Sequence, residues 1–191
     1  MSDEDDFWAN PEPWGLLALA GISFILFGLY TGRIPEEQTI FLFPIGVAGA
    51  ISQTSTGVIL LRRGNMVAGN LFAVFGNLFM ITPTLTIFLE HLMGFHVGTA
   101  VGYWTCFLGL TLWLWAIPMS RVPWVTWLVA PGAGFAFIIR GISVLYSIEM
   151  LSVLSGWIFL IFFVWALYNA LHHLGKSVGI DIPVGEPLYE E

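Results

Sequence analysis

Residues 150–171 read MLSVLSGWIFLIFFVWALYNAL, and this run contains no charged side chain. A helix needs about 20 mainly apolar residues to cross the hydrocarbon core of a bilayer, whereas a strand of a membrane barrel is about ten residues long and alternates in polarity. The run is continuous and long enough to span a membrane before polar residues return at His172 and His173. It therefore predicts a transmembrane helix.

Five further apolar runs precede this one, at about residues 14–30, 39–61, 66–89, 97–117 and 123–146. The connections between them are short and leave no room for a second domain. The sequence thus predicts an all-α integral membrane protein with a six-transmembrane-helix bundle. We expect the transmembrane domain at residues 13–173, between an acidic N-terminal tail at 1–12 and an acidic C-terminal tail at 174–191.

The composition agrees with a membrane location. Of the 191 residues, 57% are hydrophobic and 10% are charged, with a mean hydropathy of +0.83. Soluble domains carry about 25% charged residues, so an ordinary soluble enzyme or a basic nucleic-acid-binding protein is excluded. The net charge of −7 comes mostly from the tails, through Asp3, Glu4, Asp5, Asp6, Glu12, Asp181, Glu186, Glu190 and Glu191. It therefore says little about a substrate.

The distribution of basic residues predicts the orientation. Cytoplasmic loops of membrane proteins carry an excess of Lys and Arg. With six spans, both tails share one side with Arg62, Arg63, Arg121 and Lys176, and the opposite side has Arg33 and Arg140. We therefore expect a multi-pass protein of the cytoplasmic membrane with both termini in the cytoplasm.

Motifs for catalysis are missing from the sequence. It contains no GxSxG, no HExxH and no P-loop, and no pair of carboxylates falls in the middle of a span. The adjacent pair His172 and His173 is poorly placed for joint metal ligation, because neighbouring residues of a helix point in different directions. We expect no enzymatic activity, no cofactor and no metal, and the passage of a solute is the simplest function.

Polar residues inside the spans allow two interpretations. Gly49, Gln53 and Gly57 recur every four residues and share one helix face. This face forms either a tight helix contact with a hydrogen-bonded Gln53, or a stripe that lines a pore. Asn70 and Asn77 likewise face a conduit or bond to a neighbouring helix. We further expect kinks at Pro44, Pro83 and Pro131, because proline removes a backbone hydrogen bond.

Arg140 is the basic residue that lies well inside a span. Its side chain either extends to the membrane interface or attracts an anion near a pore mouth, as a carboxylate substrate would require. His91 and His96 flank the loop on the same side. They are interfacial residues or, since histidine titrates near neutrality, a pH sensor.

The motif Asn10-Pro11-Glu12-Pro13-Trp14-Gly15-Leu16 resembles the N-P-x-P-x-G-L signature of the acetate uptake transporter family, which includes the bacterial succinate–acetate permeases. Further similar motifs follow in order: Gly49, Gln53, Gly57 and Gly64-Asn65; Phe75-Gly76; Gly156-Trp157 with Tyr168; and Pro183-Val184-Gly185-Glu186. The resemblance thus runs from residue 10 to residue 186.

The resemblance implies a hexameric ring of protomers, each with its own conduit, through which acetate, related small monocarboxylates and sometimes succinate pass. By position, Leu19, Phe75 and Pro131 match places that line a narrow apolar constriction, with Phe75 as the gate, and the N-P-x-P segment caps the cytoplasmic end. We expect the rest of the substrate pathway to include Asn10, Gln53, Asn65, Asn70 and Tyr168. Amides and backbone donors near Asn10, Gln53, Asn65 and Asn70 would assist dehydration.

The chain also departs from the family pattern. The family often has Phe, Tyr and an aliphatic residue where Leu19, Phe75 and Pro131 stand, and a carboxyl where Leu60 stands. Residues 158–165 are bulkier than the small residues usual there, so a conduit that they face is narrower or differently shaped. Two other functions stay open: a channel for urea or another small amide, and a non-transporting membrane subunit or sensor whose acidic tails bind a partner.

Overall fold

The computed structural model describes residues 8–94 and 96–189, and the tail acids Asp3, Glu4, Asp5, Asp6, Glu190 and Glu191 lie outside them. The regular structure of the described residues is helical. In chain order the elements are α1 (Glu12–Tyr30), η2 (Glu36–Phe41), α2 (Leu42–Arg62), α3 (Met66–Val74), η3 (Phe75–Ile81), α4 (Thr82–Met93), α5 (Gly98–Met119), α6 (Trp124–Trp127), α7 (Val129–Tyr146) and α8 (Glu149–Ser177).

Six segments are long and apolar enough to cross a membrane: Glu12–Tyr30, Glu36–Arg62, Met66–Met93, Gly98–Met119, Trp124–Tyr146 and Glu149–Ser177. The prediction of six transmembrane helices is confirmed. The last helix continues beyond residue 171, because polar histidines do not by themselves stop a helix. It ends where Gly179 adopts a positive φ of 78° and the Ile180 amide donates to the Gly175 carbonyl at 2.8 Å, a common helix-terminating turn.

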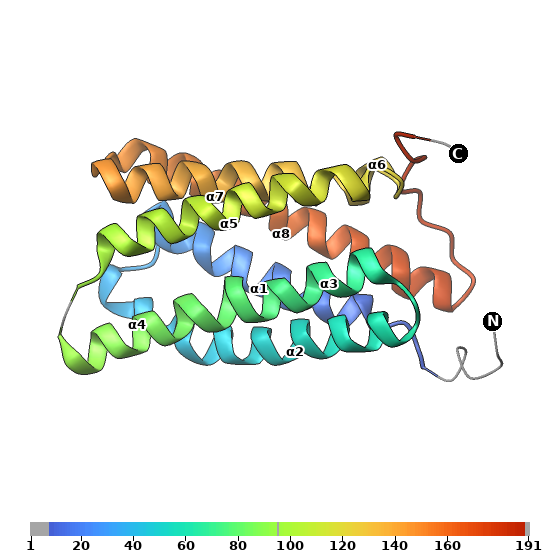
Figure 1. Ribbon diagram of the computed structural model, residues 1–191, viewed down its shortest axis with the longest axis horizontal. Helices are drawn as coiled ribbons and strands as arrows, with labels where there is room; N and C mark the ends of the chain where they lie inside the picture. Colours follow the sequence, from blue (N-terminus) through green and yellow to red (C-terminus); the bar gives the residue numbers. More distant parts are fainter. Residues whose placement is uncertain (1–7, 95, 190–191) are drawn as a thin grey trace.

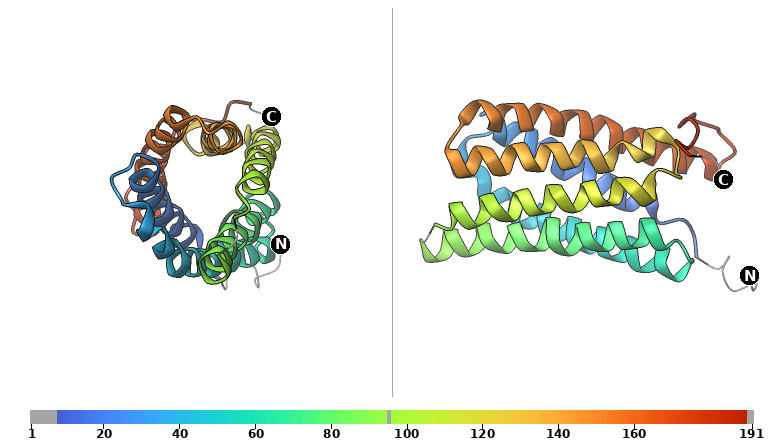
Figure 2. Two further views of the ribbon diagram at one scale, coloured as in Figure 1. Left: turned by 90° about the vertical axis from the view of Figure 1, so that its left-hand side faces the viewer. Right: turned by 45° about the horizontal axis from the view of Figure 1, so that its top comes forward.

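The six spans form a ring when they are viewed along the bundle axis (Figure 2). Around this ring α1 packs between α8 and α2, α2 packs on α3, and α5 packs on α7, which contacts α8. Contacts between α3 and α5 close the circle, so α1 and α5 lie on opposite sides of its centre. The chain enters α1 and leaves α8 at one end of the bundle (Figure 1), which we call the tail end.

Small residues bring the helix backbones into contact. A Cβ atom on Gly57 would lie 2.5 Å from the Ala73 amide nitrogen, so α2 and α3 touch through the predicted small-residue face. A second such contact joins α5 to α7, where a Cβ on Gly109 would lie 2.7 Å from the Gly134 carbonyl oxygen. These contacts fix the ring and so determine which side chains reach its centre.

The expected irregularities occur close to prolines. Pro83, the second residue of α4, lies two residues after the end of η3, a π-helical stretch at Phe75–Ile81 in which the ladder of backbone hydrogen bonds widens. The break between α6 and α7 at Leu128 lies beside Trp127, whose carbonyl cannot receive a bond from Pro131, four residues later. In the second span the 3-10 turn η2 becomes α-helical at Leu42, two residues before Pro44.

Candidate functional site: a cavity closed by apolar side chains

A cavity of about 1000 Å³ extends from the loops opposite the tail end into the centre of the ring. Titratable groups line it near these loops: Glu36, Glu90, His96, Arg140 and Glu149. We call this part the mouth. Deeper in the ring the lining becomes apolar and consists of Leu19, Phe75, Phe79, Leu108, Ala133 and Phe162. We call this set the constriction.

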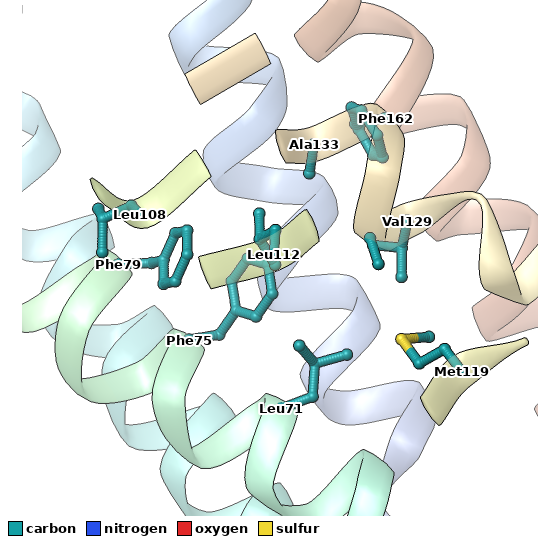
Figure 3. Packing of buried hydrophobic residues seen from close by; sticks show 10 residues of the cluster. Leu71, Phe75, Phe79, Leu108, Leu112, Met119, Val129, Ala133 and Phe162 are labelled. Atoms are coloured by element: carbon teal, nitrogen blue, oxygen red, sulfur yellow. The ribbon is translucent and has the colours of Figure 1, made fainter. Parts of the chain in front are cut away.

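The constriction belongs to a buried cluster that fills the middle of the bundle (Figure 3). The cluster contains Leu71, Phe75, Phe79, Leu108, Leu112, Met119, Val129, Ala130, Ala133 and Phe162, and Leu19 packs against it. The Phe75 and Phe79 rings stack with their centroids 4.4 Å apart. The Phe137 and Phe79 rings pack edge to face with their centroids 4.9 Å apart. An ion that entered this cluster would lose its hydration without gaining a charged partner, which is costly.

Arg140 projects from α7 into the cavity and is held on two sides. Its guanidinium lies 4.3 Å from the centroid of the Tyr30 ring, and its Nη1 donates a hydrogen bond of 2.8 Å to Ser152 Oγ. It makes no ion pair with the described residues. A guanidinium has five N–H donors, so the side chain is fixed in position and retains donors for an incoming anion.

The mouth also carries acidic groups. Glu36, Glu90 and Glu149 line it together with Arg140. The Glu90 carboxylate accepts a 2.9 Å hydrogen bond from the Val97 amide and thereby ties α4 to the start of α5. With three carboxylates against one guanidinium, the electrostatic potential favours cations and neutral molecules over anions. Of the two histidines predicted on this side, His96 lines the cavity, whereas His91 is not part of its lining.

Three of the residues predicted from the sequence meet in this cavity. Leu19 on α1 and Phe75 at the start of η3 form part of the constriction, and Arg140 lies at the mouth. Phe75 is only 4% exposed. The contacts of Arg140 are with Tyr30, the last residue of α1, and Ser152, in the first turn of α8, so the side chain reaches toward the end of the bundle as well as into the cavity.

Gln53 and Asn10 lie elsewhere in the fold. Gln53 is 1% exposed and its Nε2 donates to the Gly15 carbonyl at 2.9 Å, so it joins α2 to α1 as the helix-contact interpretation expects. Asn10 Oδ1 accepts the Glu12 amide at 3.1 Å, and its Nδ2 lies 3.3 Å from His173 Nδ1. The Pro11 carbonyl accepts a 3.3 Å bond from Thr56. The N-P-x-P segment therefore anchors the start of α1 to α2 and α8.

The remaining predicted residues also lie outside the cavity lining. Asn65 caps α3 by accepting the Ala68 amide at 3.1 Å, and the exposed Asn70 donates to its own helix at the Met66 carbonyl, 2.8 Å away. Tyr168 donates its hydroxyl proton to the Pro183 carbonyl. Pro131 belongs neither to the cavity lining nor to the buried cluster, which α7 reaches through Val129, Ala130 and Ala133.

Several lining residues are absent from the sequence-based prediction. Phe79 and Phe162 close the constriction, and Ser23 and Trp104 line the cavity between it and the mouth. One signal was available for Ser23, which follows Leu19 by four residues and so shares its helix face. The bulky sixth span does face the cavity, through Phe159 and Phe162, while Ile161 and Val164 point outward with 66% and 59% exposure.

The fold and the cavity together define a multi-pass membrane protein with a six-helix channel fold and a central, apolar constriction. The chain superposes on the structure of the bacterial acetate channel SatP with a TM-score of 0.86. The two sequences are 22% identical, and the match covers 93% of this chain and 99% of that chain. No protein-family model and no curated protein matches the sequence. The resemblance stated from the motifs is thus confirmed at the level of the fold.

Proposed function

We propose that this chain is a channel-like transporter that carries acetate or a related small monocarboxylate across the cell membrane. The observation that carries the proposal is the cavity, which leads from the fixed cation Arg140 to the apolar constriction at Leu19 and Phe75. The fold shared with an acetate channel supports the same solute class. Succinate is a further candidate, although its second carboxylate adds a desolvation cost.

The chemistry of the path favours the neutral acid at the narrowest point. The constriction contains no polar side chain that could replace the water shell of an ion. A protonated carboxylic acid enters such an environment at far lower cost than its anion. The carboxylates of the mouth act in the same direction, because a negative potential repels anions and attracts protons. Arg140 gives the carboxyl group a place to bind before it crosses.

The test is uptake of labelled acetate into proteoliposomes at stepped pH. We expect the flux to rise as the pH falls, because a larger fraction of the solute is then protonated. Formate, propionate and succinate complete the panel. If none of these solutes enters faster than into protein-free liposomes, the carboxylate proposal is wrong.

A neutral amide such as urea is the second candidate. The three carboxylates at the mouth favour it, because they oppose anions and leave neutral molecules unaffected. Urea flux that is independent of pH and insensitive to acetate would support this function over the first. If the isolated protein passes neither class of solute and co-purifies with a stoichiometric partner, the chain is a membrane subunit or sensor.

The orientation and assembly form part of the proposal. We place the tail end, with Arg62, Arg63, Arg121 and Lys176, in the cytoplasm according to the distribution of basic residues. We further propose a hexameric ring of protomers, which the resemblance implies. An impermeant thiol reagent applied to intact cells tests the orientation. It should label a cysteine at Glu37, in the exposed η2 turn that begins the second span, and leave one at Val178, directly after α8, unlabelled, in a background without Cys106.

A further inference from the structure

Two hydrogen-bond donors on the cavity walls have no protein partner within the described residues: the Ser23 hydroxyl and the Trp104 indole N–H. Ser23 is 1% exposed, and the Trp104 Nε1 atom is buried although part of its ring is accessible. Buried polar groups in folded proteins almost always have a partner. Two exceptions on the walls of one cavity indicate a ligand.

Several comparable donors elsewhere in the spans are bonded. The third buried atom without a partner among the described residues is an acceptor, Gln53 Oε1, whose own amide nitrogen is bonded. The hydroxyls of Ser52, Thr86, Thr105 and Thr111 each donate to the carbonyl four residues earlier, at distances of 2.7–2.9 Å. Ser23 could take the same bond within its helix and does not. The indoles of Trp115 and Trp127 donate to the Val67 and Ala116 carbonyls at 3.4 and 2.8 Å. Ser23 and Trp104 are therefore not typical of their residue types in this protein.

Both donors lie on the mouth side of a constriction residue. Ser23 follows Leu19 by one helical turn toward the mouth, and Trp104 precedes Leu108 by one turn in α5, which runs in the opposite direction. One turn places each donor roughly 6 Å from its constriction residue along the axis. Because α1 and α5 stand on opposite sides of the ring, the two donors flank the path between Arg140 and the constriction.

We propose that Ser23 and Trp104 form a binding site for the carboxyl group of a small monocarboxylate immediately before the constriction. This proposal rests on the proposed function. It specifies the position on the path at which the solute loses its water. An indole N–H only donates, whereas a hydroxyl donates or accepts. A carboxylate accepts from both groups. A protonated acid accepts from Trp104 through its carbonyl oxygen and donates its own proton to Ser23 Oγ. The pair can therefore hold the solute in either protonation state.

The test combines transport with a probe of the indole. In proteoliposomes, Ser23→Ala and Trp104→Phe should each raise the acetate concentration for half-maximal flux about tenfold, which is the scale of one lost hydrogen bond to a charged group. Ser52→Ala, and Trp113→Phe on the outer face of α5, are matched controls outside the cavity and should behave as wild type. In 5-fluorotryptophan-labelled protein, acetate should shift the fluorine resonance that Trp104→Phe removes, and chloride at equal concentration should not.

The outcomes separate this site from the proposed function. If wild-type protein passes no carboxylate, the proposed function fails and the site fails with it. If wild-type protein passes acetate while both variants keep the wild-type half-saturation and the Trp104 resonance does not move, only the site is overturned. A gain in thermal stability of Ser23→Ala with unchanged flux would likewise overturn it, since removal of a merely unsatisfied hydroxyl stabilises a protein.

Discussion

Arg140 shows how a single charge inside a membrane span is made tolerable. Its guanidinium rests on the Tyr30 ring at 4.3 Å and donates to Ser152 at 2.8 Å, without a carboxylate partner among the described residues. Intramembrane charges of this kind are costly and usually functional. In this protein the charge lies at the mouth of the cavity, on the path proposed for the solute.

The first prediction concerns this charge. Arg140→Gln keeps a hydrogen-bonding side chain and removes the cation, so the acetate concentration for half-maximal flux should rise about tenfold. Arg33→Gln is the matched control, because Arg33 lies over the Phe27 and Trp157 rings at 4.9 and 5.1 Å and does not line the cavity. The measurement is acetate flux into proteoliposomes that contain either variant or the wild-type protein. Equal effects of the two variants would contradict a specific role for Arg140.

The second prediction concerns Phe75, which is 4% exposed and stacks on Phe79 within the constriction. Phe75→Ala should widen the path and increase butyrate flux relative to acetate flux. Its cost in folding free energy should be about 3–5 kcal/mol, and Phe75→Leu provides a milder variant. Phe43→Ala removes a stacked phenylalanine outside the cavity and is the control. An unchanged ratio of the two fluxes in the Phe75 variants would remove this residue from the gate.

Among whole elements, the helices α5 and α7 pack through direct backbone contacts. Gly109 faces the Gly134 carbonyl, and Gly141 faces the Gly102 carbonyl, where an added Cβ would lie 2.7 and 2.8 Å from the oxygen. These four positions form a continuous contact along the two helices. The cavity wall on this side, with Trp104, Leu108 and Ala133, therefore depends on backbone contacts that lie behind it.

The third prediction follows from this contact. Gly109→Val must push α5 away from α7 and should cost about 1–3 kcal/mol of stability, seen as a lower Tm in detergent or lipid. The control is Gly21→Ala on α1, where an added Cβ has no neighbour within 4 Å. Equal melting temperatures of the two variants would contradict a close backbone contact between α5 and α7.

At the scale of the whole molecule, the outer face of the ring carries two polar side chains that apolar lipid would not favour. Asn70 and Asn77 are exposed, and each donates to a carbonyl of its own helix at 2.8 Å. The Asn77 amide also donates to Thr54 Oγ1 at 3.5 Å. Among the described residues, the second donor of Asn70 and the amide oxygens of both side chains are left to meet a neighbouring protomer. Polar residues of this kind often join helices within membranes.

The fourth prediction therefore concerns assembly. Wild-type protein should run as a hexamer in mass measurements of the detergent complex. The double variant Asn70→Leu, Asn77→Leu should shift the population toward smaller species. Thr111→Val makes a comparable polar-to-apolar change on the outer surface of α5 and should leave the mass unchanged. A wild-type mass that corresponds to one protomer would refute the proposed hexamer.

A structural feature of this protein can be predicted from the sequence when it depends on residues that are close together in the chain. The apolar runs are local, so six spans and their approximate bounds could be predicted. The end of α8 could not be predicted from its histidines, because the left-handed turn at Gly179 decides it. Gln53 shows the limit more clearly. Its spacing with Gly49 and Gly57 defines a helix face, and only the packed structure shows that this face meets α1.

The sequence by itself determined that the chain belongs in a bilayer, because the lengths of its uncharged segments match the hydrocarbon thickness. It also singled out Leu19, Phe75 and Arg140, which the structure places along one cavity. Only the tertiary structure decided that Ser23 and Trp104 stand on opposite sides of the ring, that Pro131 lies outside the cavity lining, and that three carboxylates line the mouth together with Arg140. These features depend on the rotational orientation of each helix about its axis and on the closure of the ring. Contacts between helices, such as Gly109 against Gly134, determine both.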